Sequence, residues 1–349
     1  MAERPGAAGP LKFLYPGWFA IVMGLAGLSL AWHRAAPLMG EMATGVALVV
    51  AALAVGVFAV LLAATAWRWR AHPEAWAEDR RHPVRHTFIA TLPISMMVLA
   101  TAGVSLLGPS GPVEALWWLG ALSQLAVTWW VLSRWWRPGT GGLPWASVTP
   151  ALLMPVVGNV LAPLAGVPLG HADWSAAQFG IGLLFWPVIV VLLGVRIASH
   201  GMLPERLLPT LFILLAPPAL VGSCLLQFGA PMALAWGCWG IAAFCFAWVA
   251  GTAPRLRQLA FSIPHWGMSF PLTAFAALTL RLAAPGSVLA VGAMALLALA
   301  SLVILGLMAG TFRGLRDGSL LAPEPVAAIA VAAASAHPGA GGTGPAHAG

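Results

Sequence analysis

The stretch 269–280, SFPLTAFAALTL, is an apolar segment interrupted by a proline, Pro271. A proline inside a helix removes a backbone hydrogen bond and crowds the preceding turn, at a cost of about 3 kcal/mol or more. Three other long apolar segments contain a comparable proline, namely Pro93, Pro155 and Pro217, and the four are spaced 62, 62 and 54 residues apart. In a bilayer the freed carbonyls are tolerated where they face protein or a water-filled cavity. The repeat therefore predicts bent helices arranged around a shared axis.

The composition identifies an integral membrane protein. Of the 349 residues, 60% are hydrophobic and 8% are charged, whereas soluble domains contain about 25% charged residues. A hydrocarbon core of roughly 30 Å needs about 20 helical residues per crossing. We expect an all-α fold with ten transmembrane helices, near residues 14–32, 42–67, 87–107, 113–133, 145–168, 175–198, 207–229, 232–253, 265–283 and 286–311. The first twelve residues are polar and lead directly into a span, so no cleavable signal is expected.

The charge distribution predicts the topology. The chain has 17 Lys and Arg residues against 10 Asp and Glu, a net charge of +7. In the ten-span arrangement only Arg34 and Arg281 lie on one side, and the other basic residues lie on the opposite side. This positive-inside pattern predicts a multi-pass protein of the cell (inner) membrane with both termini in the cytoplasm. Because the asymmetry accounts for the positive charge, we expect no nucleic acid as a partner.

Helix-breaking residues favour the odd-numbered spans of the five predicted helical hairpins. The first span lacks a central proline but has Gly24 and Gly27, which permit bending and close packing. The seventh contains the pair Pro217 and Pro218. We predict an inner ring of five kinked helices around a pore and an outer ring of five straighter helices. The alternative is that prolines are simply commoner in membrane helices, and Pro187 in the sixth span departs from the pattern.

Three regions are predicted along the chain. Residues 1–12 form a cytoplasmic N-terminal tail, 13–315 a ten-helix transmembrane transport domain, and 316–349 a cytoplasmic tail rich in Ala, Gly and Pro. The last region has too few large apolar residues to bury a core, so we expect it to be disordered.

The predicted lumen has no fixed charge. No acidic residue lies deeper than the first turn of a span, and the two basic residues counted within spans, Arg196 and Arg281, lie near an end where they can snorkel. Proton-coupled carriers usually need intramembrane Asp, Glu or His, so the pattern favours passive permeation. Half-helix N-termini at mid-membrane and the cationic inner side both favour small inorganic or organic anions.

The candidate polar and metal-binding residues are few. Asn159 in the fifth span is either a pore-lining residue or the donor in a helix–helix hydrogen bond. His82 and His86 have a spacing that suits a metal on a helix, but Pro83 between them marks a helix start, so we predict no metal and no cofactor. An intramembrane enzyme would need a nucleophile–base pair or a metal cluster at membrane depth, which the spans lack, so no enzyme activity is predicted.

Three motifs resemble the TehA family of tellurite-resistance and dicarboxylate transporters, which includes the plant guard-cell slow anion channels. They are PGWFAIVMGLAGLSLAW (16–32), HPVRHTFIATLPISMM (82–97) and HWGMSFPLTAFAALTL (265–280). The resemblance implies a homotrimer with one pore per protomer, five inner helices kinked at prolines or glycines, and a phenylalanine plug on the ninth span. Matching SFPLT places that pore gate at Phe270. From the sequence alone, a phenylalanine in an apolar helix indicates core or lipid-facing packing, and only its position in the motif singles out Phe270. Ala20 stands where the family pattern has a glycine.

Two transport functions follow from the resemblance. The first is a gated anion channel or uniporter with an uncharged pore closed by Phe270. The alternative is a carrier or exporter of C4-dicarboxylates, sulfite or tellurite-related oxyanions.

Overall fold

The computed structural model describes residues 9–136, 143 and 145–322. Within them the chain is helical and has no strand. The predicted tails 1–12 and 316–349 fall largely outside the described residues. Eight helical segments are long and apolar enough to cross a membrane: Pro16–Arg34, Glu41–Ala71, Arg85–Leu107, Gly111–Trp135, Ala172–His200, Glu205–Gln227, Met232–Ala250 and Val288–Arg316. The other two predicted spans correspond to Pro150–Gly166, which is shorter, and to Ile263–Leu282, which is not among the eight. The count of ten crossings and the five-hairpin arrangement stay predictions.

Five segments are composite helices that begin as 3-10 helix and continue as α-helix. They are η2 (Pro16–Phe19) with α1 (Ala20–Arg34), η3 (Arg85–Ala90) with α5 (Thr91–Leu107), η5 (Pro150–Leu152) with α7 (Leu153–Val157), η6 (Gly158–Leu161) and α8 (Ala162–Gly166), η7 (Glu205–Leu215) with α10 (Ala216–Gln227), and η8 (Ile263–Met268) with α13 (Ser269–Leu282). The predicted kink prolines cluster at these junctions. Pro93, Pro155, Pro217 and Pro271 are each the second or third residue of the α-helical part. A proline is tolerated in the first turn of an α-helix, because the missing N–H has no α-helical partner there.

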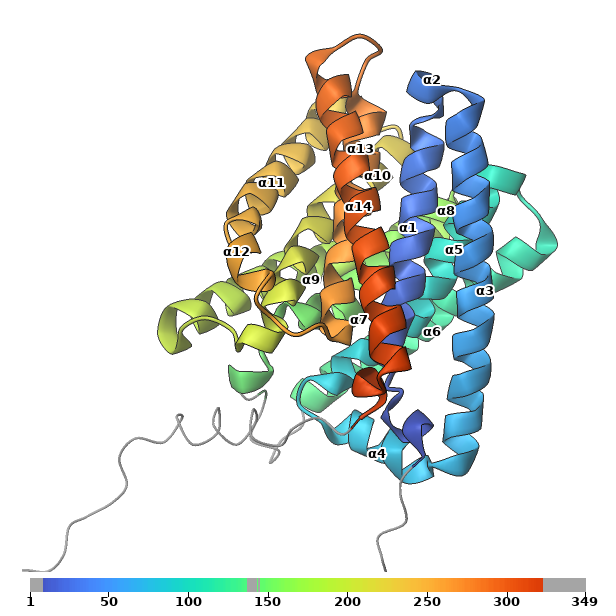
Figure 1. The fold of residues 1–349 in the computed structure, drawn as a ribbon. Coiled ribbons are helices and arrows are strands. Elements are labelled where there is room, and N and C mark those ends of the chain that lie inside the picture. The colour runs from blue at the N-terminus through green and yellow to red at the C-terminus, as the bar shows by residue number, and fades with distance from the viewer. Residues whose placement is uncertain (1–8, 137–142, 144, 323–349) are drawn as a thin grey trace, which may run out of the picture.

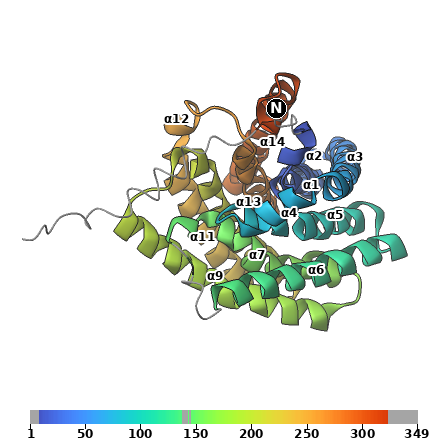
Figure 2. The same ribbon diagram turned by 90° about the horizontal axis from the view of Figure 1, so that it is seen from below.

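The remaining long helices are α-helical throughout and lie outside the composite ones. They are α3 (Glu41–Ala71), α6 (Gly111–Trp135), α9 (Ala172–His200), α11 (Met232–Ala250) and α14 (Val288–Arg316). Only 17–33% of their apolar windows is buried, against 61–89% for the three composite segments that meet the same length criterion. In Figure 2, α3, α6 and α9 lie at the rim of the molecule. Their exposed side chains include many large apolar residues, as expected for helices that face lipid.

The helix α1 packs against α3, α5 and α13, so segments from both ends of the chain meet in the interior (Figure 1). Two glycines make this approach possible. A Cβ at Gly24 would lie 2.3 Å from the Ser269 hydroxyl, and a Cβ at Gly27 would lie 2.3 Å from that of Thr273. The two glycines thus leave room for the contact between α1 and α13, and α1 itself is one continuous helix without a break at either glycine.

Short elements complete the described fold. They are η1 (Pro10–Phe13), α2 (Ala36–Met39), α4 (Pro73–Arg81), η4 (Trp145–Ser147), α12 (Ala253–Leu256) and η9 (Ser319–Leu321). The connection through α4 is held by a buried ion-pair cluster in which Asp79 contacts Arg68 at 2.7 Å and Arg85 at 3.0 Å. His82 follows α4, and its Nδ1 accepts hydrogen bonds from the backbone N–H groups of Val84 and Arg85. His82 thus caps η3, and the described residues contain no group of three potential metal ligands.

Candidate functional site

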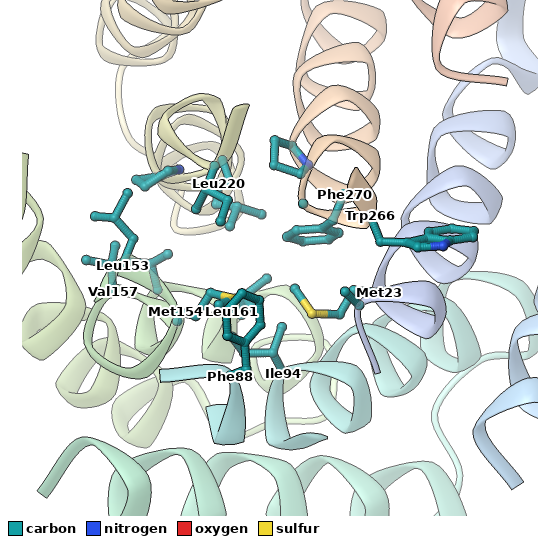
Figure 3. Close-up of a pocket in the computed structure, with 18 residues that line it drawn as sticks. Met23, Phe88, Ile94, Leu153, Met154, Val157, Leu161, Leu220, Trp266 and Phe270 are labelled. Atoms are coloured by element: carbon teal, nitrogen blue, oxygen red, sulfur yellow. The ribbon is translucent and has the colours of Figure 1, made fainter. Parts of the chain in front are cut away.

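Two cavities lie between the composite helices. The first, here called the apolar cavity, is lined only by apolar residues (Figure 3). Its lining comes from all five composite segments and consists of Ala20, Met23, Phe88, Ile94, Leu153, Met154, Val157, Gly158, Val160, Leu161, Ile213, Ala216, Pro217, Leu220, Trp266, Gly267, Phe270 and Pro271. It offers about 50 Å³ to the centres of water-sized spheres, whereas one water needs roughly 10–15 Å³. It can therefore hold several waters or a small ion.

The second cavity, here called the arginine cavity, is lined by later residues of the same five segments. The lining consists of Gly27, Leu30, Arg34, Val98, Thr101, Leu161, Leu164, Leu220, Ser223, Phe270, Thr273, Ala274, Ala277 and Arg281. It offers about 60 Å³ by the same measure. In every segment the residues of the apolar cavity come first and those of the arginine cavity follow. The five segments therefore run in the same direction along the two cavities.

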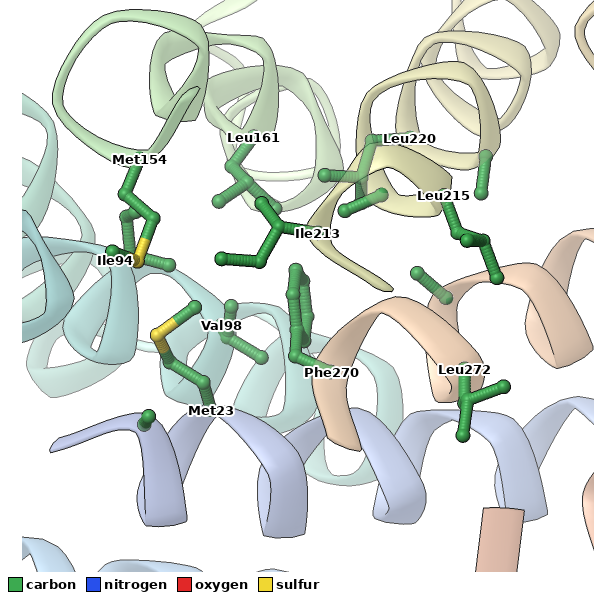
Figure 4. Close-up of a cluster of buried hydrophobic side chains, with 14 of the residues drawn as sticks. Met23, Ile94, Val98, Met154, Leu161, Ile213, Leu215, Leu220, Phe270 and Leu272 are labelled. Atoms are coloured by element: carbon green, nitrogen blue, oxygen red, sulfur yellow. The ribbon is translucent and has the colours of Figure 1, made fainter. Parts of the chain in front are cut away.

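Three side chains belong to both linings: Leu161, Leu220 and Phe270. Phe270 is 6% exposed, and its ring points from α13 into the space between the helices, toward Ile213 (Figure 4). The boundary between the two cavities is thus made of two leucines and one aromatic ring. Of the three, the phenyl ring is the largest group, so a change of its rotamer would change the boundary most.

The position of Phe270 depends on its neighbours in α1 and α13. A Cβ at Gly27 would lie 2.9 Å from Cδ2 of Phe270, so the ring rests against a part of α1 that has no side chain. The Thr273 hydroxyl donates to the Phe270 carbonyl oxygen at 2.9 Å. Trp266, just before the 3-10 to α junction, donates from its indole N–H to Thr311 of α14 at 2.8 Å. The gate candidate therefore lies on a segment that is anchored on both sides of it.

The predicted kink prolines are all buried. Pro217 and Pro271 line the apolar cavity, whereas Pro93, Pro155 and Pro218 are buried outside both linings.

Asn159 lies outside both linings and is fully buried. Its amide N–H groups donate to the Thr128 hydroxyl at 2.8 Å and to the Val156 carbonyl at 2.9 Å. Its oxygen accepts a hydrogen bond from Gln178 at 3.0 Å. Thr128 is on α6 and Gln178 on α9, so Asn159 joins the third composite helix to two outer helices. This geometry favours the helix–helix hydrogen bond over pore lining.

The prediction of an uncharged lumen fits the apolar cavity and is wrong at the arginine cavity, where Arg34 and Arg281 contribute to the lining. Arg281 was expected to snorkel, but its Nη1 donates to the Ser223 carbonyl of α10 at 3.0 Å and so stays between the helices. One sequence signal was overlooked. Arg281 is eleven residues after Phe270, about three turns, which places both on one face of α13.

The helical architecture, the apolar outer faces and the two internal cavities define a multi-pass membrane protein. Residues 14–312 match the model of the SLAC1 family, described as voltage-dependent anion channels, and the chain belongs to this family. The predicted TehA-family membership is confirmed.

Curated relatives support this assignment. A tellurite resistance protein TehA homolog from Haemophilus influenzae is 29% identical over 267 residues, which cover 74% of this chain and 78% of that protein. The S-type anion channel SLAH2 of Arabidopsis thaliana is 27% identical over 209 residues, 60% of this chain and 40% of that protein. The sulfite efflux pump SSU1 of Trichophyton rubrum is 23% identical over 308 residues, 77% of this chain and 81% of that protein. These three relatives are named as a resistance protein, an anion channel and an efflux pump, and none of the three is named as an enzyme.

Proposed function

We propose that the protein is a gated anion channel or uniporter whose passage is closed by the ring of Phe270. The observation that supports this most directly is that Phe270 borders both the apolar and the arginine cavity. The five composite helices would form the inner ring of the pore, and α3, α6, α9, α11 and α14 the outer ring.

A ring at an apolar constriction is a physically reasonable gate. A narrow apolar passage expels water, so an ion cannot cross it with its hydration shell, and a change of rotamer would widen and rewet it. No acidic residue lines either cavity in the described part of the chain, so nothing in the lining favours cations over anions. The apolar lining would also bind an ion weakly, which suits rapid passage.

The proposal includes an orientation and an assembly. The apolar cavity would face the cytoplasm, with both termini on that side of the cell (inner) membrane, and the arginine cavity would face outward. The protein would assemble as a homotrimer with one passage per protomer, which the mass of the solubilised protein would test.

The second candidate is a carrier or exporter of C4-dicarboxylates, sulfite or tellurite-related oxyanions. The names of the TehA homolog and of the SSU1 pump favour it. A closed boundary between two cavities is also what an occluded carrier has. A carrier would show saturable flux or exchange between substrates, whereas a channel would show current proportional to the driving force over a wide range.

The test is anion current through the purified protein in planar bilayers, comparing wild type with Phe270→Ala. Removing the ring joins the two cavities, so we expect current to rise by about tenfold or more.

Phe275→Ala is a matched control, because Phe275 is on the same helix and 2% exposed but packs against Trp239 and Phe246 of α11. It loses a comparable side chain from the interior without opening the boundary, so its current should stay near that of wild type. Equal current in wild type and Phe270→Ala would refute the gate, and equal gains in both variants would indicate general loosening of the fold.

A further inference from the structure

The arginine cavity contains two guanidinium groups that the proposed gate does not use. Arg34 is the last residue of α1, and Arg281 lies in the last turn of α13. Both line the cavity that ends at Phe270. Two cations in one cavity repel each other, so the arrangement is favourable only when an anion lies between them or water screens them.

Neither arginine is neutralised by the protein. None of the ion pairs among the described residues includes Arg34 or Arg281. The Arg34 guanidinium group has no hydrogen-bond partner within the part of the chain that the structure describes. Arg281 uses one N–H group on the Ser223 carbonyl, which leaves four of its five donors.

The hydroxyl groups of the same cavity cannot supply the missing donors. Thr101, Ser223 and Thr273 each donate their only hydroxyl hydrogen to a carbonyl of the preceding helical turn. Their oxygens are left as acceptors, which do not attract an anion. Recognition of an anion in this cavity therefore rests on the two guanidinium groups.

We propose that Arg34 and Arg281 form a binding site for small oxyanions, such as sulfite or a carboxylate, at the end of the arginine cavity remote from Phe270. A guanidinium group presents parallel N–H donors that match two oxygens of one anion, and it is weakly hydrated and always charged. Two such groups bind an anion with several oxygens better than they bind a halide, which offers a single centre. The site would raise the local concentration of oxyanions beside the gate.

This inference rests on the proposed function in one respect, the placement of the site on the permeation route. The binding itself does not depend on it. The same chemistry would also recognise the phosphate of a lipid headgroup, because Arg34 is exposed. The free anion is the occupant that the geometry favours, since Arg281 is held inward by α10 and lines the interior cavity.

The alternative is a purely structural role, in which both arginines stabilise helix C-termini, where the helix dipole favours a positive charge. A cation in that role would not distinguish sulfite from chloride.

The first test is made in the Phe270→Ala background, which removes the gate. We expect the sulfite concentration that gives half-maximal current to rise by about tenfold in Arg281→Gln and in Arg34→Gln, because each loses charge-assisted hydrogen bonds to the anion. The same value for chloride should change by about threefold or less. Arg281→Lys keeps the charge but loses the planar fork, so it should weaken sulfite more than chloride. Arg255→Gln in α12, outside both linings, controls for the loss of one positive charge.

The second test does not depend on current. Sulfite should raise the melting temperature of the detergent-solubilised wild type. Arg281→Gln should need a sulfite concentration at least about tenfold higher for the same rise. If an anionic phospholipid, but not sulfite, stabilises the protein in an arginine-dependent way, the site belongs to a headgroup and the proposal is overturned. Equal responses of wild type and both glutamine variants to sulfite would also overturn it. A Phe270→Ala variant that carries no current refutes the proposed gate but leaves this binding test intact.

Discussion

The apolar cavity and the arginine cavity are lined by the same five composite helices, yet their linings differ in chemistry. The apolar cavity lies along the 3-10 segments and the first α-helical turns, where the prolines cluster and no lining residue is polar. The arginine cavity lies along the later α-helical turns, where hydroxyl groups and two arginines enter the lining. Phe270, Leu161 and Leu220 separate them.

The difference separates two tasks that one passage must perform. Closure needs a narrow apolar place that excludes water, and the apolar side of Phe270 supplies it. Attraction of an anion needs exposed positive charge, which would be costly to bury beside the gate. Arg281 lies about three turns along α13 from the ring, and Arg34 lies at the end of α1 in the same cavity lining. The comparison therefore predicts that changes at the ring alter how much passes, whereas changes at the arginines alter which anion is preferred.

The contact between Gly27 and Phe270 offers the strongest way to disturb this separation. In Gly27→Ala the new Cβ would lie 2.3 Å from the Thr273 hydroxyl and 2.9 Å from the Phe270 ring, so α1 and α13 must move apart or the ring must turn. We expect a loss of stability of about 1–3 kcal/mol from overpacking, together with increased anion leak. Thermal unfolding in detergent and bilayer current measure the two effects.

Gly56→Ala is the matched control, since nothing lies within 4 Å of a Cβ added at Gly56 in α3. It should leave both stability and current near wild-type values. Unchanged stability and current in Gly27→Ala would mean that the packing of Phe270 on α1 does not hold the boundary in place.

A smaller effect should arise outside both cavity linings, at His82 in the connection after α4. Burial lowers the pKa of His82 to about 4, helped by the positive charge of Arg85. In the unfolded chain a histidine has a pKa of about 6.5. As the pH falls from about 6.5 toward about 4, His82 becomes protonated in the unfolded state but stays neutral in the folded state. The free energy of unfolding therefore decreases across this pH range.

We expect this loss to be about 1 kcal/mol between about pH 7 and about pH 5, after allowance for the partial exposure of the ring. His82→Asn keeps an oxygen that can accept from the Val84 and Arg85 N–H groups but does not titrate, so its melting temperature should depend less on pH. The anion selectivity of this variant should match wild type. An equal pH dependence in both proteins would exclude His82 as the source.

Much of the fold could be predicted because membrane helices leave a strong signal in composition. Apolar length predicted the eight long helical segments, and the spacing of Pro93, Pro155, Pro217 and Pro271 singled out four of the five composite helices. The form of the break was not predictable. An isolated proline indicates a kink, but the change from 3-10 to α-helix around it depends on the packing of the neighbouring helices.

The candidate site was predicted in part. Phe270 was reached through the resemblance of SFPLT to a family motif, because one phenylalanine among fourteen has no distinguishing property of its own. The position of Arg281 in the lining of the arginine cavity was missed, because its place near a span end suggested snorkelling. Its hydrogen bond to Ser223 shows that the side chain stays between the helices. Asn159 was left open in the sequence, since both alternatives need the same residue type at the same depth.

The ring of Phe270 is proposed to close the boundary between the apolar cavity and the arginine cavity, so that its removal joins them. This proposal can be tested with single cysteines in a protein whose Cys224, Cys238 and Cys245 are replaced by alanine. Ala277→Cys lies in the arginine cavity and Met23→Cys in the apolar cavity.

A negatively charged methanethiosulfonate reagent is added from the side of the arginine cavity, and the rate of labelling is measured. With Phe270 in place, Ala277→Cys should react and Met23→Cys should remain unlabelled; with Phe270→Ala, both should react. Labelling of Met23→Cys at the same rate in the two backgrounds would contradict the account.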